Sequence, residues 1–264
     1  MKKKMFVSIA SFFCVGLLAA QEKQSTETPE QQAAKTEVWS PVPKKVDAAV
    51  KTSEPPADAY VLFNGKSLNE WVLTSHPDQM ATWIINKDGS MMVNKNAGNI
   101  QTKKSFTDYQ LHLEFKIPAT ITGEGQARGN SGLFLASTGS GDAGYEIQIL
   151  DNYTNKTYVN GQCGSVYKQF PPLVNACRKA GEWQSYDIIW TAPRFNEDGS
   201  LKSPARVTVF QNGILVQNNT ELKGETRWIG TPEYHKHGAC PIKLQAHGDK
   251  SEPISFRNIW VREL

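Results

Sequence analysis

The sequence has 264 residues, of which 39% are hydrophobic, and its formal net charge at neutral pH is +3. This length is sufficient for one sizeable hydrophobic core, even if the first part of the chain does not join it. Much of the positive charge lies in the first residues and no basic surface is indicated, which disfavours a nucleic acid as the partner.

The first 20 residues predict a secretory signal peptide. Residues 2–4 are lysines, an apolar run follows over residues 5–18, and Ala20 supplies a small residue for cleavage. The apolar run is too short for a membrane span, and no later one is long enough. A lipid anchor on Cys14 is not expected, because Phe13 stands where a small residue is needed. We therefore expect an exported protein of the periplasm or cell surface.

Residues 21–58 predict a flexible polar linker, and residues 59–264 predict the folded domain. The linker is rich in Gln, Glu, Lys, Thr and Pro and has few large apolar side chains. Such a segment cannot bury enough apolar surface to offset the entropy that it would lose on ordering.

The domain shows strand patterns throughout and no helical period of useful length. In YQLHLEFKI, residues 109–117, apolar side chains alternate with polar ones, which is the period of a half-buried strand. Asp-Gly at 88–89 and Asn-Gly at 212–213 each separate two apolar runs and predict hairpin turns. Many short strands joined by turns predict an all-β fold, a β-sandwich or jelly roll of two antiparallel sheets.

Two of the predicted strands carry polar side chains on the face that points away from the core. In YEIQILD, Glu146 and Gln148 alternate with apolar residues. In PIKLQAHG, the alternating polar residues are Lys243, Gln245 and His247. A solvated sheet surface accounts for any one of these side chains. The set as a whole also fits a groove, because a histidine within reach of a carboxylate can act as an acid–base pair.

Asp151 comes five positions after Glu146, so strict alternation places it on the opposite face of the strand. A β-bulge would bend the strand and bring the carboxylate back to the polar face. Alternatively, Asp151 caps the loop that follows. Both alternatives stay open.

Two irregular segments add candidate binding residues. In ARGNSGLFL, Arg128, Asn130 and Ser131 could hold an anionic or hydroxyl-rich group, although a turn that enters a strand has the same composition. The long loop GSVYKQFPPLVNACRKAGEW contains Tyr167 and Lys168. Loops of this length in compact domains are commonly functional, and its aromatic and proline content argues against disorder.

Three cysteines remain after the predicted cleavage: Cys163, Cys177 and Cys240. In an exported protein they predict one disulfide and one free thiol. We favour the pairing of Cys163 with Cys177, because these two flank a loop that contains proline.

Several sharp functional motifs are missing from the sequence. It has no nucleotide-binding glycine loop, no G-x-S-x-G and no H-E-x-x-H. His235 and His237 lie in a loop rich in glycine and proline, and they are expected to be surface residues rather than metal ligands.

Longer motifs resemble a known family. They are LFNGKSLNEW, GNSGLFL, YEIQILD, GSVYKQFPPLVNACRKAGEWQSYDIIWTAPRF, VTVFQNGILV and PIKLQAHGDKSEPISFRNIWVREL. In this order, over residues 60–264, they are similar to the 3-keto-disaccharide hydrolase family, formerly a domain of unknown function. The resemblance implies a concanavalin A-like jelly roll, the fold of many lectins and glucanases, and action on sugars oxidised at carbon 3.

Such a substrate suggests a mechanism. A 3-keto group acidifies the proton on carbon 2, so a base can remove it while an electrophile stabilises the enolate. The aglycone then leaves from carbon 1, and water adds to the resulting enone, which completes a net hydrolysis of the glycosidic bond.

The resemblance also suggests roles for individual residues. Glu146, Gln148 and Asp151 match the E-x-Q-x-x-D stretch of the family. Gln245 and His247 match its Q-x-H-G stretch. These matches raise the expectation that both segments contact an oxidised oligosaccharide or glycoside.

We predict Glu146, His247 and Lys168 as catalytic residues. Glu146 or His247 would be the base, and Lys168 or Arg128 would polarise the ketone. The predicted substrate-binding residues are Arg128, Asn130, Ser131, Gln148, Tyr167 and Gln245. The sequence requires no cofactor, but a divalent cation could replace the electrophile, with Glu146 and Asp151 as its ligands.

Two other functions are kept as alternatives. Glucanases of this fold use E-x-D-x-x-E for retaining hydrolysis, and the present stretch has the same spacing but lacks the central Asp and the final Glu. A non-catalytic carbohydrate-binding module would stack Trp71, Trp83 or Trp228 on sugar rings. Core packing is the expected role of each of these tryptophans.

Overall fold

The structure is a computed structural model that describes Thr28, Gln31 and residues 54–264. The predicted signal peptide and nearly all of the predicted linker fall outside the described residues. Residues 54–264 belong to one unit of the chain, which contains all of its described strands.

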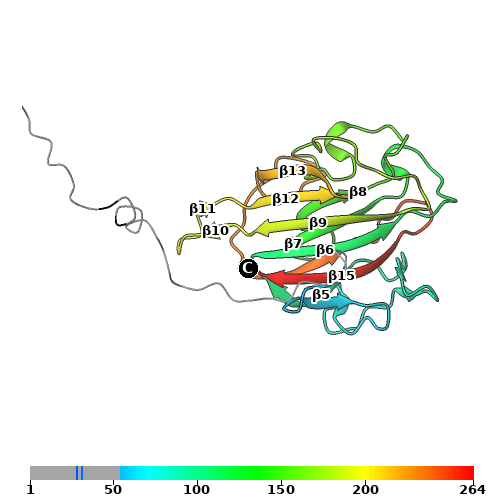
Figure 1. The fold of residues 1–264 in the computed structure, drawn as a ribbon, viewed down its shortest axis with the longest axis horizontal. Helices are drawn as coiled ribbons and strands as arrows, with labels where there is room; N and C mark the ends of the chain where they lie inside the picture. The colour runs from blue at the N-terminus through cyan, green and yellow to red at the C-terminus, as the bar shows by residue number, and fades with distance from the viewer. Residues whose placement is uncertain (1–27, 29–30, 32–53) are drawn as a thin grey trace, which may run out of the picture. The chain divides into compact units, whose positions relative to one another are not determined.

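The larger of two antiparallel sheets has eight strands and faces the viewer in Figure 1. Its strands follow the order β13-β12-β9-β6-β15-β4-β3. Strand β4 pairs with the first residues of β15, and β1 pairs with residues 259–261 of the same strand. Their bounds are β1 Tyr60–Phe63, β3 Ile84–Ile85, β4 Met91–Met92, β6 Tyr109–Lys116, β9 Trp183–Thr191, β12 Arg206–Gln211, β13 Ile214–Glu221 and β15 Ser255–Glu263.

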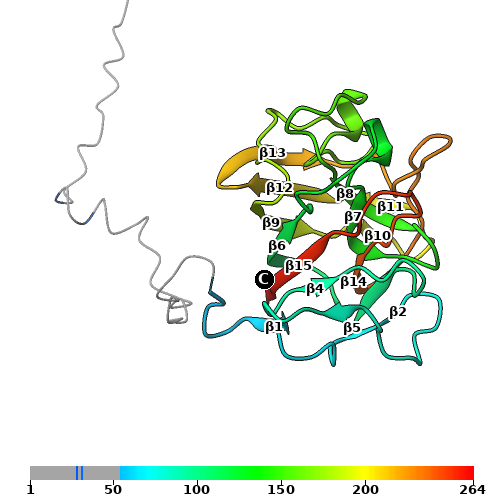
Figure 2. The ribbon, with the colours of Figure 1, turned by 90° about the vertical axis from the view of Figure 1, so that its right-hand side faces the viewer.

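The smaller sheet has five strands in the order β2-β5-β14-β7-β8. Their bounds are β2 Trp71–Leu73, β5 Ile100–Phe106, β7 Ser131–Ser137, β8 Gly144–Ile149 and β14 Cys240–Leu244. Turned by 90°, the molecule shows strands of this sheet beside those of the larger one (Figure 2). A separate hairpin joins β10 Arg194–Phe195 to β11 Leu201–Ser203.

The hydrophobic core fills the space between the two sheets. Leu111, Leu113 and Phe115 of β6 are fully buried, as the alternating pattern predicts. Ile147 and Ile149 of β8 are fully buried from the other side. Each such side chain stabilises the fold by about 1.5–3 kcal/mol relative to an exposed position. The all-β sandwich predicted from the sequence is confirmed.

Two contacts join the sheets at β8, the strand that carries YEIQI. The ring of Tyr145 packs 5.4 Å from that of Trp190 of β9, centroid to centroid. The hydroxyl of Tyr186, also on β9, donates a hydrogen bond of 2.6 Å to the backbone oxygen of Gln148. The larger sheet therefore fixes β8 from its core side, which leaves the opposite face of the strand for other groups.

Both predicted hairpins are present. Ile84–Ile85 pairs with Met91–Met92 across the Asp-Gly turn. In the β12–β13 hairpin, Asn212 and Gly213 have φ of 55° and 79°. Positive φ at both central residues matches the right-handed twist of the strands, which explains the preference for Asn-Gly at this turn.

The predicted disulfide between Cys163 and Cys177 is not formed. Cys163, Cys177 and Cys240 are all free thiols in the structure. The amide nitrogen of Gln211 instead donates to both sulfurs of the predicted pair, at 3.5 Å and 3.4 Å. The two thiols of the predicted pair nevertheless lie next to each other, since a hydrogen bond between them contributes to the pKa shift of each.

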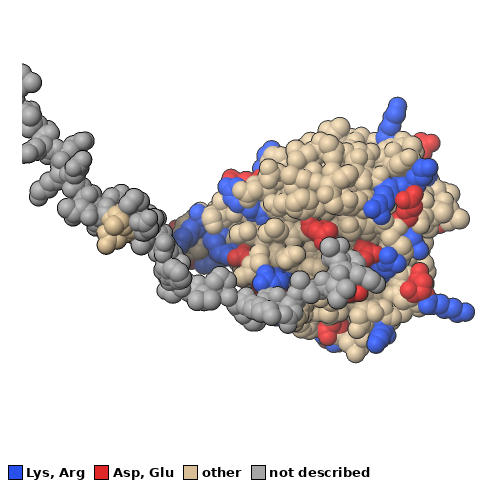
Figure 3. Space-filling model, viewed as in Figure 1, with Lys and Arg blue, Asp and Glu red and all other residues tan. Residues whose placement is uncertain are grey.

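Helical structure in the part of the chain from residue 54 onward consists of two short 3-10 turns, η1 Gly125–Ala127 and η2 Val159–Gly161. Neither is long enough to cross a bilayer, and the described residues contain no other candidate helix. On the face seen in Figure 3, positive and negative side chains are interspersed rather than gathered by sign.

Candidate active site

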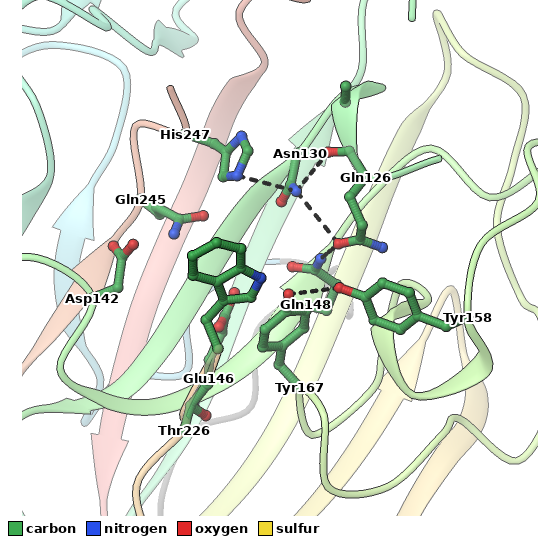
Figure 4. A pocket seen from close by; sticks show the side chains of 12 residues that line it. Gln126, Asn130, Asp142, Glu146, Gln148, Tyr158, Tyr167, Thr226, Gln245 and His247 are labelled. Atoms are coloured by element: carbon green, nitrogen blue, oxygen red, sulfur yellow. Dashed lines mark hydrogen bonds between the residues drawn. The ribbon is translucent and has the colours of Figure 1, made fainter. Parts of the chain in front are cut away.

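A pocket of about 530 Å³ lies against the outer face of the smaller sheet. Its floor is formed by β8 and by the residues that follow β14, and loops from four other parts of the chain form its walls (Figure 4). The lining residues are Gln126, Ala127, Asn130, Asp142, Glu146, Gln148, Tyr158, Tyr167, Thr226, Trp228, Gln245 and His247. The volume is in the range of about 300–1,000 Å³ that is typical of small-molecule sites.

Strand β7 brings the two predicted polar segments together. Gly132 of β7 pairs with Gln148 of β8 on one side. On its other side, the backbone oxygen of Gly132 accepts a hydrogen bond of 2.9 Å from the backbone nitrogen of Gln245. Gln148 and Gln245 thus flank a glycine on one face of the sheet.

The missing side chain at Gly132 makes room for the Glu146 carboxyl on the pocket floor. A Cβ atom at this position would lie 2.5 Å from Oε1 of Glu146 and 2.9 Å from a ring carbon of Phe134. Both distances are far inside van der Waals contact, so the Glu146 carboxyl occupies the space that any larger residue at 132 would take.

Glu146 is a buried carboxyl without a hydrogen-bond partner among the described residues. It is only 5% exposed. Burial, followed by the negative charge of Asp142, raises its pKa to about 8, although the nearby Lys243 opposes the rise. At neutral pH this group is therefore mostly a neutral acid, which can donate a hydrogen bond or a proton.

Lys243 supports the site from below rather than lining it. Its ammonium group donates hydrogen bonds to the backbone oxygens of Gly141 and Ala143, at 2.9 Å and 2.6 Å. It also lies 4.5 Å from the centre of the Phe134 ring. Burial lowers the pKa of Lys243 to about 8, although the nearby carboxylates of Asp142, Glu146 and Glu225 act to raise it. The lysine thus fixes the loop that presents Asp142 to the pocket.

His247 is held by a carboxylate on one side and faces the pocket with the other. Its Nδ1 lies 2.6 Å from Oδ2 of Asp249. Its Nε2 lies 3.4 Å from the amide nitrogen of Asn130, which can donate to it (Figure 4). The Asn130 amide makes a shorter bond of 2.7 Å to the backbone oxygen of Gln126. This arrangement keeps the proton of a neutral imidazole on Nδ1 and makes Nε2 the acceptor atom on the pocket side, as a general base requires.

Asp249 is in turn fixed by its surroundings. Its Oδ1 accepts a hydrogen bond of 2.6 Å from the backbone nitrogen of Ser251 and lies 3.2 Å from the ammonium group of Lys95. Burial alone would raise the pKa of Asp249, but hydrogen bonds from Ser251 and His247 and the charge of Lys95 hold it below its usual value. Asp249 is therefore a permanent anion behind the imidazole.

Two amide oxygens in the pocket are buried and have no partner. They are Oε1 of Gln148 and Oε1 of Gln245. The amide nitrogen of Gln148 is oriented by Oε1 of Gln126, which accepts a hydrogen bond of 2.9 Å. A buried acceptor without a donor costs about 1–3 kcal/mol. A ligand with hydroxyl groups would satisfy both oxygens.

The sequence matches the family of 3-keto-alpha-glucoside-1,2-lyase-like domains over residues 58–262. The chain belongs to this family. The resemblance inferred from the sequence motifs is confirmed.

Solved structures give the same result. A candidate glycosyl hydrolase from Parabacteroides distasonis is 50% identical, with 91% of this chain and 100% of that chain covered and a TM-score of 0.82. Two further candidate glycosyl hydrolases from the same organism are 20% and 23% identical, with TM-scores of 0.57 and 0.54. They cover 83% and 78% of this chain, and 100% and 99% of their own, and show a shared fold. A search of curated proteins gives no significant match. The family and its 50% identical relative support a carbohydrate-active enzyme of the glycosyl hydrolase type.

In this member of the 3-keto-alpha-glucoside-1,2-lyase-like family, six of the residues predicted to form the site line the pocket. They are Asn130, Glu146, Gln148, Tyr167, Gln245 and His247. The other four predicted residues, Arg128, Ser131, Asp151 and Lys168, do not line it.

Arg128 and Asp151 pair with each other. The guanidinium Nε of Arg128 donates to Oδ2 of Asp151 at 2.7 Å. Oδ1 of Asp151 accepts a hydrogen bond of 3.3 Å from the backbone nitrogen of Tyr153, so of the two alternatives Asp151 takes the capping role. The irregularity between β7 and β8 lies between Phe134 and Ser137 and does not re-aim Asp151.

The predicted pairing of Glu146 with Asp151 as metal ligands does not agree with this geometry, because Arg128 engages the second carboxylate. Within residues 54–264, no group of three or more His, Cys, Asp or Glu side chains is arranged to hold a metal ion. His235 is half-exposed beside Glu225, with 3.2 Å between Nδ1 and Oε1.

Ser131 and Lys168 serve neighbouring backbone groups. The hydroxyl of Ser131 donates to the backbone oxygen of Gln245 at 2.7 Å, which fixes the segment after β14. The ammonium group of Lys168 donates to the backbone oxygen of Trp228 at 2.7 Å. Neither side chain is therefore directed at a ligand on the pocket floor.

The tryptophans separate into two groups. Trp71 is fully buried and Trp83 nearly so, as core packing predicts. Trp228 is 71% exposed and lines the pocket, so core packing was the wrong expectation for it. Loop residues such as Trp228 have no strand period that would separate a surface from a core position.

The sequence did not predict the polar lining residues Gln126, Asp142, Tyr158 and Thr226, or Asp249 behind His247. Gln126 and Asp142 lie in glycine-rich turns whose composition resembles any loop. Asp249 had a local signal, since it lies two residues after His247, with Ser251 two residues further on. That spacing favours a turn in which the carboxylate accepts from its own backbone.

Proposed function

We propose that this protein is an exported enzyme that cleaves the glycosidic bond of 3-keto-disaccharides or other 3-keto-glycosides. The bond is broken by elimination across carbons 1 and 2, and hydration of the product completes a net hydrolysis. Family membership supports the substrate class. The observation that supports it in the site is the pair of unpartnered amide oxygens, those of Gln148 and Gln245. They lie in the same pocket as the neutral carboxyl of Glu146 and the oriented imidazole of His247.

Substrate binding starts at the glutamines. Oε1 of Gln148 and Oε1 of Gln245 accept hydrogen bonds from hydroxyl groups of the keto-sugar ring, because both are buried acceptors that lack a donor. Since the two residues flank Gly132 on one face of the sheet, and the Glu146 carboxyl occupies the space above this glycine, the ring lies against that carboxyl.

His247 is the base in this proposal. Its Nε2 removes the proton from carbon 2, and the electrons of the C–H bond form the enolate of the 3-keto group. Asp249 stabilises the imidazolium that results, because its pKa is held low and it lies 2.6 Å from Nδ1. The proton taken up by His247 is then available for the departing glycosidic oxygen.

Glu146 is the electrophile. Its neutral carboxyl donates a hydrogen bond to the oxygen on carbon 3 as negative charge develops there. When the enolate collapses, its electrons form the bond between carbons 1 and 2 and the bond from carbon 1 to the aglycone breaks. This role replaces the one predicted for Lys168 or Arg128, whose donors are engaged by Trp228 and Asp151.

An ordinary retaining glycosidase is the second candidate, because two carboxyl groups, Asp142 and Glu146, line the same pocket. Such an enzyme needs a carboxylate nucleophile and a carboxylic acid on opposite sides of the glycosidic bond. Asp142 is exposed and accepts a hydrogen bond of 3.0 Å from Asn99. A retaining glycosidase mechanism gives the His247–Asp249 pair no role, and we therefore rank this function second.

One experiment separates these functions. The purified protein is incubated with a 3-keto-disaccharide, the unoxidised disaccharide and a β-glucan, each with and without a chelator. We expect cleavage of the keto sugar alone. Cleavage of the glucan with survival of the keto sugar would refute the proposal, and retention of a glycan without cleavage would indicate a binding module. Loss of activity with chelator would assign the electrophile to a divalent cation.

Exchange at carbon 2 tests the assignment of the base. In deuterated water, the wild-type enzyme should incorporate deuterium at carbon 2 of an uncleaved 3-keto-glycoside. We expect His247→Ala to abolish this exchange and Glu146→Gln to retain part of it, because an amide can still donate a hydrogen bond. The reverse pattern would make Glu146 the base.

Export is tested separately. We expect the protein in the periplasmic or surface fraction of the cell, with a mature N-terminus at Gln21. A full-length N-terminus in the cytoplasmic fraction would contradict the signal peptide.

A further inference from the structure

We infer that the mouth of the pocket is a subsite for the leaving group, and that it is built for a flat, apolar aglycone. The inference rests on the proposed cleavage of 3-keto-glycosides and adds to it the class of alcohol that is released. It is carried by Trp228, by its neighbour Ile229 and by the contacts that hold them.

The pocket changes in polarity from its floor to its mouth. Glu146, Gln148 and Gln245 on the floor are between 1% and 6% exposed. Trp228, which lines the same pocket, is 71% exposed, and the adjoining Ile229 is 76% exposed. A substrate whose keto-sugar ring reaches the floor therefore leaves its aglycone against the apolar mouth.

A large apolar side chain that is exposed beside a pocket, as Trp228 is, indicates a binding surface rather than a packing role. An indole ring has a broad flat face and only two side-chain torsions, so it loses little entropy when a planar group stacks on it. An aromatic aglycone fits such a face in shape and polarity.

The backbone at Trp228 is held in place by Lys168. The ammonium group of Lys168 donates 2.7 Å to the backbone oxygen of Trp228 and lies 5.7 Å from the centre of the Tyr158 ring. The hydroxyls of Tyr158 and Tyr167 are 2.6 Å apart and bond to each other (Figure 4). The mouth is thus pre-organised by contacts within the β8–β9 loop and between it and the β13–β14 loop.

These same contacts favour an aromatic aglycone over a second sugar. A sugar leaving group needs hydrogen-bond partners around its ring, as the floor provides. At the mouth, Lys168 is turned to a backbone oxygen and the two tyrosine hydroxyls are paired with each other. The exposed carboxylate of Asp142, which also lines the pocket, accepts a hydrogen bond of 3.0 Å from Asn99. The main apolar surface that remains for the leaving group is the exposed indole face of Trp228.

The test compares leaving groups of similar basicity. The substrates are the 2-phenylethyl and ethyl 3-keto-glucosides, which differ in the aromatic ring and not in the bond that breaks. We expect Trp228→Ala to lower kcat/KM for the phenylethyl substrate about tenfold, mainly through KM. The ethyl substrate should change less than about twofold, because it does not reach the indole. Trp228→Phe should restore most of the loss.

Two variants serve as controls. Phe210→Ala removes an exposed aromatic ring from the larger sheet, 36% exposed, and should affect neither substrate. Lys168→Met breaks the bond to the Trp228 backbone and should selectively weaken the phenylethyl substrate. An equal fall in kcat for both substrates with Lys168→Met would instead make Lys168 a catalytic electrophile and would overturn its part in the subsite.

The outcomes distinguish this inference from the proposed function. If wild-type enzyme cleaves neither substrate nor a 3-keto-disaccharide, the proposed function fails. If it cleaves them and Trp228→Ala lowers both rates equally, the subsite alone is refuted. If Trp228→Ala weakens a 3-keto-disaccharide as much as the phenylethyl substrate, the subsite takes a sugar and the assignment of an aromatic aglycone is wrong.

Discussion

Each of the two sheets carries a histidine–aspartate pair on its outer side, and the two pairs have the same geometry in different surroundings. On the larger sheet, Nδ1 of His112 lies 2.6 Å from Oδ1 of Asp187. Beside the smaller sheet, Nδ1 of His247 lies 2.6 Å from Oδ2 of Asp249. Only the surroundings can therefore distinguish a structural pair from a functional one.

In the pair on the larger sheet, neighbouring protein side chains meet the hydrogen-bonding capacity of the histidine. Nε2 of His112 lies 3.3 Å from the amide of Asn258, and its ring stacks on Trp260 at 5.4 Å. Nearby, Glu114 accepts a hydrogen bond of 2.6 Å from Arg257. A hollow of about 470 Å³ adjoins these residues, yet their charges are paired with one another.

The pair beside the smaller sheet faces groups that lack partners. Nε2 of His247 also has an amide nearby, that of Asn130 at 3.4 Å, but this amide makes a shorter bond of 2.7 Å to the backbone oxygen of Gln126. The same pocket contains the Glu146 carboxyl and the unpartnered amide oxygens of Gln148 and Gln245. Unmet hydrogen-bonding capacity, rather than the presence of a histidine and a carboxylate, is what marks a site for a polar ligand.

The largest expected effect follows from removing each histidine in turn. His247→Ala should lower kcat on a 3-keto-glycoside by about 10²–10⁴-fold, the usual contribution of a general base, and leave the unfolding midpoint nearly unchanged. His112→Ala should lower the unfolding midpoint and leave kcat of the folded protein unchanged. Steady-state kinetics and urea unfolding of both variants check this. The opposite assignment of effects would reverse the interpretation of the two pairs.

A methyl group on the pocket floor should have the next largest effect. In Gly132→Ala, the new Cβ would lie 2.5 Å from Oε1 of Glu146, which must move. Displacement of a catalytic group by about 1 Å costs about 10²-fold in rate. Gly238→Ala is the matched control, since a Cβ there meets nothing within 4 Å. Equal activity of the two variants would show that the Glu146 carboxyl has no role at its present position.

Replacing the aspartate that pairs with each histidine should have a smaller effect than replacing the histidine, on activity for Asp249 and on stability for Asp187. Asp249→Asn removes the anion that stabilises the His247 imidazolium, and we expect a fall in kcat of about tenfold or more. Deuterium exchange at carbon 2, which reports proton removal by the base, should fall together with kcat. Asp187→Asn, on the larger sheet, should alter stability and leave both kcat and exchange unchanged. Unchanged kcat and exchange in Asp249→Asn would limit Asp249 to a structural role.

The strands and the polar floor of the pocket could be predicted because their signals are local or periodic. Alternation alone placed Glu146 and Gln148 on the polar face of one strand, and Gln245 and His247 on the polar face of a second strand. That β7 lies between them, with Gly132 leaving room for the Glu146 carboxyl, depends on strand order. Strand order is set by long-range pairing, which no local pattern encodes.

The walls of the pocket could not be predicted, since their side chains are positioned by loops that meet only in the folded chain. Lys168 has a φ of 58° and reaches the backbone of Trp228, 60 residues later. Arg128 finds Asp151 across 23 residues. The sequence gives the type of a charged loop residue, but its partner can be identified only in the folded structure.

The smallest expected effect is a difference in pH dependence between the two regions. Burial of His112 would lower its pKa, but hydrogen bonds to Asp187 and Glu114 overcome this and raise it from 6.5 to about 9. A raised pKa in the folded state stabilises the protein below the unfolded value of 6.5, and this contribution is lost as pH rises through about 9. The rise corresponds to at most ~3 kcal/mol. Urea midpoints should therefore fall between about pH 6 and pH 10 in the wild type, and less in His112→Gln.

Activity should instead respond to Glu146 in the pocket. Its pKa of about 8 means that the neutral acid, which donates to the developing enolate, is lost as pH rises through that value. We expect kcat to fall by up to tenfold per pH unit on the alkaline side while the protein stays folded. Glu146→Gln should be slower and lack this limb, because an amide does not titrate. An alkaline limb that persists in Glu146→Gln would have to come from another group, and His112 would be excluded by measuring the same profile in His112→Gln.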